Sequence, residues 1–164
     1  MRTIDFIFDI NEIFSLVSGI TFTRDYDLDP SKNSVLVEKY GMSEDENYLF
    51  MNYLKIAADV VWDNVKCHSP NEDFEFDSFI LGRRVIKYVI NIGKSNDEKI
   101  KDYMLLTMRD YILKEWYLNK GATGIYQEYE YQFNQNINRL IMRGAGMNKD
   151  TGRNTLLIRN GFFS

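Results

Sequence analysis

The chain has 164 residues, of which 45% are hydrophobic and 27% charged, values that fit one globular domain and exclude wholesale disorder. Two prolines and ten glycines argue against a β-sandwich with many tight turns, and the single cysteine excludes a disulfide within the chain. Residues 1–79 carry 16 Asp and Glu against 6 Lys and Arg, a net charge of −10, whereas residues 80–164 carry 8 against 14, a net charge of +6. The two halves either neutralise each other within one fold or give neighbouring copies opposite surfaces.

The N-terminal region predicts a short helix and no targeting segment. Acidic residues break every apolar run there, so we expect neither a signal peptide nor a membrane span. A first helix is expected over Asp9–Ser18, with Gly19 ending it. Residues 20–42 are interpreted as an irregular acidic segment with one or two helical turns over Val35–Tyr40.

The second helix has the clearest start in the sequence. Ser43-Glu44-Asp45-Glu46 is a capping box, in which Ser43 and Glu46 satisfy each other's backbone N–H groups. Two apolar stripes follow at spacings of three and four, Leu49, Tyr53, Ile56 and Val60 in one and Phe50, Leu54, Ala57, Val61 and Val65 in the other. This helix is expected to stop before Pro70.

Residues 73–92 change to a period of two. Apolar Phe74, Phe76 and Ile80 alternate with Asp73, Glu75 and Asp77, in a register that places Phe79 with the second set. β-Branched residues follow Gly82. The pattern predicts a β-hairpin that turns near Gly82, with a helix over Phe79–Ile90 as the alternative.

Two long helices are predicted after the hairpin. Ser95-Asn96-Asp97-Glu98 is a second capping box, which starts a helix that runs to about Leu118. From Ile100 to Leu118, 12 of 19 residues are apolar or aromatic and point in every direction, so this helix is expected to be central. A glycine cap at Gly121 leads to a fourth helix, which has one apolar stripe and is expected to end at Gly144 and Gly146.

The predicted fold is therefore mainly α. A single helical domain over residues 1–143, a bundle of about four helices with a small β-hairpin near 73–92, precedes an extended C-terminal arm over 144–164. The arm is basic and carries two apolar clusters, so it is expected to fold back on the bundle or to dock on a neighbour by strand addition or groove insertion. The expected partner-interface residues are Arg143, Lys149, Arg153, Leu156, Leu157, Ile158, Arg159, Phe162 and Phe163.

No motif for catalysis or cofactor binding emerges from the sequence. Cys67 and His68 are adjacent and therefore poorly placed to share a metal or to form a nucleophile pair, so we expect Cys67 against the core and His68 exposed. The acidic run from Asp25 begins like a calcium loop, but Pro30 stands where glycine is needed and Leu36 where a bidentate Glu is needed. A looser cation site stays open there. We expect a protein that is not an enzyme and has no cofactor and no metal site.

The order of these features resembles one class of viral protein. A capping box starts an apolar helix, a β-like segment follows, and two helices come next, containing Tyr111-Ile112-Leu113-Lys114-Glu115-Trp116-Tyr117 and Tyr126-Gln127-Glu128-Tyr129. Over about residues 43–150 this order is similar to the head–tail connector proteins of tailed bacteriophages, also called adaptor, ring or neck proteins. The likeness is closest to those of phages of Bacteroides-like hosts, including the crAss-like group.

The resemblance implies a structural virion protein that is assembled in the host cytoplasm. It would form a homo-oligomeric ring, commonly of twelve copies, between the portal and the tail, and DNA would pass through the lumen without sequence-specific binding. Its partners would be the portal and other neck or tail proteins, with no membrane contact. The two oppositely charged halves fit a head-to-tail ring. The alternative is a small, non-enzymatic helical adaptor or regulator that binds a protein partner through the Tyr126–Ile141 face.

Overall fold

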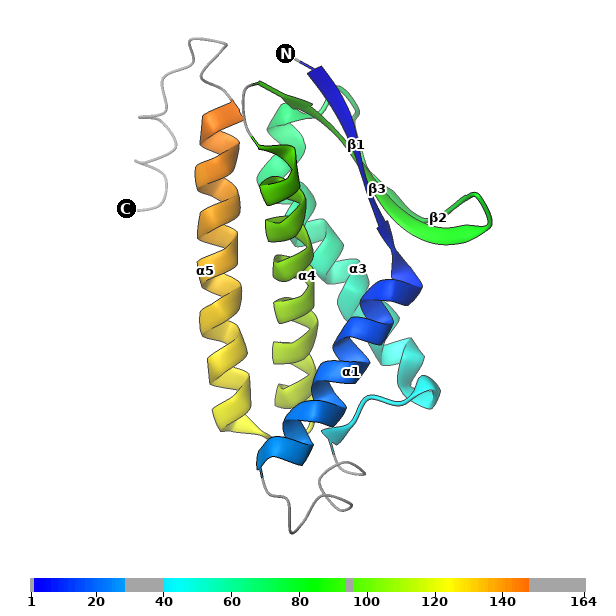
Figure 1. Ribbon diagram of the computed structural model, residues 1–164, viewed down its shortest axis with the longest axis vertical. Coiled ribbons are helices and arrows are strands. Elements are labelled where there is room, and N and C mark those ends of the chain that lie inside the picture. Colours follow the sequence, from blue (N-terminus) through cyan, green and yellow to red (C-terminus); the bar gives the residue numbers. More distant parts are fainter. Residues whose placement is uncertain (1, 29–39, 94–95, 148–164) are drawn as a thin grey trace.

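A computed structural model of the chain describes residues 2–28, 40–93 and 96–147. These residues form a mainly helical fold with a small three-stranded antiparallel sheet (Figure 1), as the sequence predicts. The elements in chain order are β1 (Arg2–Asp9), α1 (Ile10–Leu28), α3 (Asn47–Val65), β2 (Glu75–Ile80), β3 (Arg83–Ile92), α4 (Asp97–Asn119) and α5 (Thr123–Met147). Short 3-10 turns at Glu44–Glu46 and Lys66–His68 lead into and out of α3.

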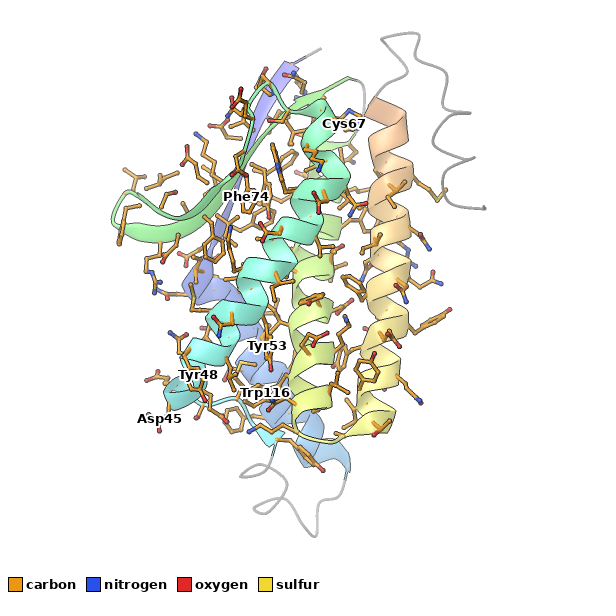
Figure 2. All side chains as sticks on the ribbon, turned by 180° about the vertical axis from the view of Figure 1, so that it is seen from behind. Asp45, Tyr48, Tyr53, Cys67, Phe74 and Trp116 are labelled. Carbon is orange, nitrogen blue, oxygen red and sulfur yellow. The ribbon has the colours of Figure 1, made fainter. Side chains whose placement is uncertain are left out.

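Helix α4 is the central element of the bundle. Helix α5 lies along one side of it, and α1 and α3 cover it from opposite faces (Figures 1 and 2). Ile100, Met108 and Leu113 are fully buried, although they point in different directions from α4. The predicted central position is confirmed. Each such side chain contributes about 1.5–3 kcal/mol by leaving water.

The sheet has the strand order β1-β3-β2, and both pairs are antiparallel. Strand β1 pairs with β3 along its whole length, from Arg2 opposite Ile92 to Asp9 opposite Val85. Alternate residues form the core face of the sheet, which packs on the helices: Phe6, Phe8, Ile86, Tyr88, Ile90 and Ile92 are all buried. The Tyr88 hydroxyl, for example, donates to the Ala58 carbonyl of α3 at 2.9 Å.

The N-terminal prediction is wrong in two respects. Strand β1 precedes the helix and was not expected, although the alternation of Ile4, Phe6 and Phe8 with other residues is a strand signal. Helix α1 then continues through Gly19 to Leu28, so residues 20–28 of the segment interpreted as irregular are helical. A glycine inside a helix costs only about 1 kcal/mol, a cost that tertiary packing can override. The turns expected over Val35–Tyr40 lie outside the described residues, apart from Tyr40 itself.

Most predicted helix ends are confirmed. The capping box is present, with the Ser43 N–H donating to Glu46 Oε2 at 3.3 Å. The second cap differs by one residue, because Asn96 and not Ser95 is the cap, and its side chain accepts from the Lys99 N–H at 3.2 Å.

The turn between α4 and α5 is the glycine cap that the sequence predicts. Gly121 has a φ of +74°, and the Ala122 N–H donates to the Tyr117 carbonyl at 2.9 Å. The far end of α5 departs from the prediction, because the helix passes through Gly144 and Gly146 and ends at Met147. The expected boundary between domain and arm at residue 144 therefore falls inside a helix.

Candidate interaction surface

The β2–β3 hairpin is anchored to α3 by aromatic residues at its base. The Phe74 ring stacks on Tyr88 with 5.0 Å between centroids and lies 5.8 Å from Trp62 of α3. Lys55 Nζ, also on α3, lies 4.8 Å from the centre of the Phe74 ring and 4.9 Å from that of Phe76. Figure 2 shows Phe74 between the sheet and α3. These contacts fix the base of the hairpin against the helical body.

A β-bulge at Asp77 interrupts the hairpin halfway along β2. The pairing with β3 shifts by one residue between Glu75 and Ser78, so β2 holds one residue more than its partner there. Asp77 has a φ of +56°, and its two carboxylate oxygens each accept a 2.7 Å hydrogen bond from Arg84. These hydrogen bonds lower the pKa of Asp77 below its ordinary value.

The bulge places Phe79 on the core face of the sheet. Phe79 lies opposite Arg84, which is two and four residues from the buried Ile86 and Tyr88 and so shares their face. The sequence pattern assigned Phe79 to the face opposite Phe76. That assignment is wrong, because the extra residue in β2 reverses the alternation after Asp77.

Beyond the end of β1 the hairpin continues without a third strand and projects from the body (Figure 1). Strand β1 ends at Asp9, opposite Val85, and β2 and β3 pair beyond this point up to the turn. None of the described helices covers the core face at the tip, and Phe79 is 73% exposed and Leu81, in the turn, 98% exposed. Large apolar side chains that stand together in water mark an interaction surface.

Leu81 adopts a backbone conformation that suits asparagine or glycine. Its φ is +51° and that of Gly82 is +76°, so both central residues of the two-residue turn have the positive φ of a type I′ turn. For a residue with a Cβ atom, left-handed backbone costs roughly 1–2 kcal/mol. A leucine at this position therefore lowers the stability of the fold, and it also exposes a large apolar side chain. Backbone strain of this kind clusters at functional sites.

Arg83 adds a positive charge next to the turn. It pairs with Ile80 and therefore lies on the face of the hairpin opposite to Phe79. Its Nη1 lies 3.7 Å from carboxylate oxygens of both Asp9 and Glu12, and its side chain remains 67% exposed. Contacts of this length at an exposed site contribute little to stability. We call Phe79, Leu81 and Arg83 the hairpin tip.

A buried polar pair joins α4 to α5. Asp110 is fully buried and Asn136 is 5% exposed, and the Asn136 Nδ2 group donates to Asp110 Oδ2 at 2.6 Å. The Arg109 Nε group donates to Asp110 Oδ1 at 2.7 Å. Burial raises the pKa of Asp110, and the charge and hydrogen bonds of Arg109 and Asn136 only partly offset that effect. The burial of Asp110 and Asn136 was not predicted from the sequence, because polar residues on a long helix usually face water. We interpret the pair as a contact that sets the register of the two helices.

Cys67 and His68 are placed opposite to the prediction. Cys67 is exposed, whereas His68 is only 8% exposed. Both residues belong to the 3-10 turn after α3, which has three residues per turn, so the α-helical spacing does not predict which of them faces inward. Over the described ranges, no three His, Cys, Asp or Glu side chains are arranged to hold a metal ion.

The predicted partner-interface residues fall mostly outside the described part of the chain. Arg143 is half-buried near the end of α5. The other eight lie beyond Met147 and outside the described residues: Lys149, Arg153, Leu156, Leu157, Ile158, Arg159, Phe162 and Phe163. The sequence signal that could have located the hairpin tip is Leu81-Gly82, a large apolar residue where a hairpin turn favours asparagine.

Comparison with known proteins adds no relative: no protein-family model, curated protein or solved structure matches this chain. Among the helices that the structure describes, none is sufficiently long and apolar to cross a lipid bilayer.

Proposed function

We propose that this chain is a structural, non-enzymatic subunit that assembles with copies of itself through the hairpin tip. The observation that supports this role is the combination of exposure and strain at one residue. Leu81 is 98% exposed and has a φ of +51°, and neither property benefits an isolated molecule. Full burial of Leu81 in a contact would recover about 1.5–3 kcal/mol, a gain of the same order as the cost of its conformation, roughly 1–2 kcal/mol.

The assembly that we propose is the head–tail connector ring of a tailed bacteriophage. Its support is the sequence resemblance over about residues 43–150, together with a bundle built around α4 and a projecting hairpin at one side. A head-to-tail ring needs two different, complementary surfaces on each copy. A rigid body that carries a small protruding contact is suited to this arrangement. In this proposal DNA passes through the ring without sequence-specific contacts, and the portal and neighbouring tail proteins bind the two faces of the ring.

Electron microscopy of the purified protein, together with mass spectrometry of virions from the phage that encodes it, tests this proposal. We expect closed rings in the first experiment and several copies of the chain per particle in the second. A purified protein that is monomeric, together with virions that lack the chain, would overturn the connector role. A soluble protein partner recovered in that case would favour the helical adaptor instead.

A further inference from the structure

We propose that the hairpin tip of one copy docks on the outer face of α3 in a second copy. This inference rests on the proposed assembly role and names the surface that receives the tip. The surface consists of Tyr48, Asn52 and Ile56, with Asp45 at one end, and we call it the α3 stripe.

The α3 stripe is an exposed surface on the outside of the bundle, with Tyr48 and Ile56 on either side of Asn52. Tyr48, Asn52 and Ile56 are spaced by four and therefore lie on one side of the helix, over a length of about 12 Å. Tyr48 is 64% exposed and Ile56 is 47% exposed. Figure 2 shows Asp45 and Tyr48 together at the start of this helix, at the edge of the molecule. The stripe is long enough to receive both Phe79 and Leu81.

The charges at the two surfaces are complementary. The tip carries Arg83, which lies on the hairpin face opposite to Phe79. Its side chain is 67% exposed and lies 3.7 Å from carboxylate oxygens of Asp9 and Glu12. The turn before the stripe carries three acidic residues, of which Glu46 is bound to Lys120 at 2.7 Å. Glu44 and Asp45 are exposed and form no ion pair with another described residue. A cation next to the turn of the tip thus matches an acidic group at one end of the stripe.

Four of the other large exposed apolar residues fit the tip less well; a fifth, Leu118 at the end of α4, is 50% exposed. On α5, Met142 is 74% exposed but lies between Arg139 and Arg143 along the chain, and these like charges would repel Arg83. Tyr131 is 66% exposed and lies 11 positions before Met142, about 16 Å along the helix, too far for one tip to cover both. On α1, Leu16 and Phe22 are only 37% exposed.

The tip and the α3 stripe are different parts of the same molecule. A contact between them is therefore heterologous, so each copy donates a tip to one neighbour and receives a tip from another. Repetition of such a contact gives a closed ring or an open filament. Because both surfaces belong to the same chain, a single double variant can exchange the two charges of the contact.

Sedimentation equilibrium of three variants of the full-length chain tests the inference. Arg83→Glu and Asp45→Arg should each weaken self-association by about tenfold or more, because each places like charges together. The double variant restores an opposite pair with its signs exchanged, and its affinity should return to within about threefold of the wild type. Lys99→Glu and Glu98→Arg are the matched controls, because both sites are exposed. Glu98 lies in the first turn of α4, as Asp45 lies in the turn that leads into α3. The controls should associate like the wild type, and thermal unfolding should show that all variants are folded.

A double variant that associates no better than the single variants would overturn the docking of the tip on α3. The same conclusion would follow if Arg83→Glu associated like Lys99→Glu. Loss of assembly on replacement of Leu81, measured in the same series, would then leave the proposed assembly role intact and direct the search to another receiving surface. A wild-type chain that does not self-associate would overturn both proposals.

Discussion

Asp77 and Arg84 face each other across the β2–β3 hairpin, joined by two 2.7 Å hydrogen bonds that end on separate carboxylate oxygens. This planar, bidentate pair lies where β2 holds its extra residue and where Asp77 has a φ of +56°. The pair therefore stabilises the bulge that turns Phe79 to the core face. The ion pair between Asp77 and Arg84 therefore determines on which face of the hairpin Phe79 is exposed.

Replacement of Asp77 by alanine should destabilise the hairpin and disturb the tip. The variant loses the pair with Arg84 and keeps a Cβ atom at positive φ, so we expect a loss of about 1 kcal/mol in the free energy of unfolding, reduced by the partial exposure of both groups. Asp77→Gly is the control, because it loses the same pair but relieves the backbone. Urea unfolding of both variants measures the difference. Equal stability of the alanine variant and the wild type would show that the pair does not hold the bulge.

Replacement of Asp110 by asparagine should change how stability depends on pH. Burial raises the pKa of Asp110 in the folded protein, so its contribution to stability is largest below the ordinary aspartate pKa and is lost as the pH rises through the raised value. Asp110→Asn removes this loss. The stability of the variant relative to the wild type should therefore increase as the pH is raised from about 4 to 7.

Denaturant unfolding at several pH values measures this difference, and subtraction of the two proteins cancels the other titrating groups. A difference that stays constant with pH, or that falls as the pH rises, would contradict the assignment. Asn136→Asp is an informative companion, because it would place two carboxylates in one buried site and should be far more destabilising at pH 7 than at pH 4.

The elements that the sequence predicted best are those whose signals are local. The capping box at Ser43, the glycine cap at Gly121 and the even distribution of apolar residues on α4 each depend on neighbours a few positions away. Strand β1 was missed because a lone edge strand of eight residues needs its partner β3, which lies more than 70 residues later. The face of the sheet on which Phe79 lies depends on the bulge at Asp77. The alternation of polar and apolar residues in the sequence does not indicate this bulge.

The interface expected at the end of the chain can be tested by deletion. All buried apolar residues of the described part lie between Phe6 and Leu140, so removal of residues 148–164 should leave helicity and the unfolding temperature unchanged. If Lys149 to Phe163 contact a neighbour, as the sequence predicts, the truncated protein should associate more weakly than the full chain. Circular dichroism and sedimentation measure the two properties separately. A marked fall in unfolding temperature would show that the segment belongs to the core of its own molecule.

The replacement Leu81→Asn separates folding from assembly at the hairpin tip. Asparagine tolerates positive φ in a type I′ turn, so the variant should be more stable than the wild type by about 1 kcal/mol. It also removes the most exposed apolar side chain of the tip, and assembly should be lost. Met142→Asn, at a site 74% exposed on α5, is the matched control and should assemble like the wild type.

Native mass measurement of the wild type and of Leu81→Asn at the same concentration tests whether the chain assembles through the hairpin tip. We expect a multiple of the 19.4 kDa chain mass for the wild type and a single 19.4 kDa chain for the variant, and we expect the variant to unfold at the higher temperature. A wild-type protein that is monomeric, or a Leu81→Asn variant that assembles as fully as the wild type, would contradict assembly through the hairpin tip.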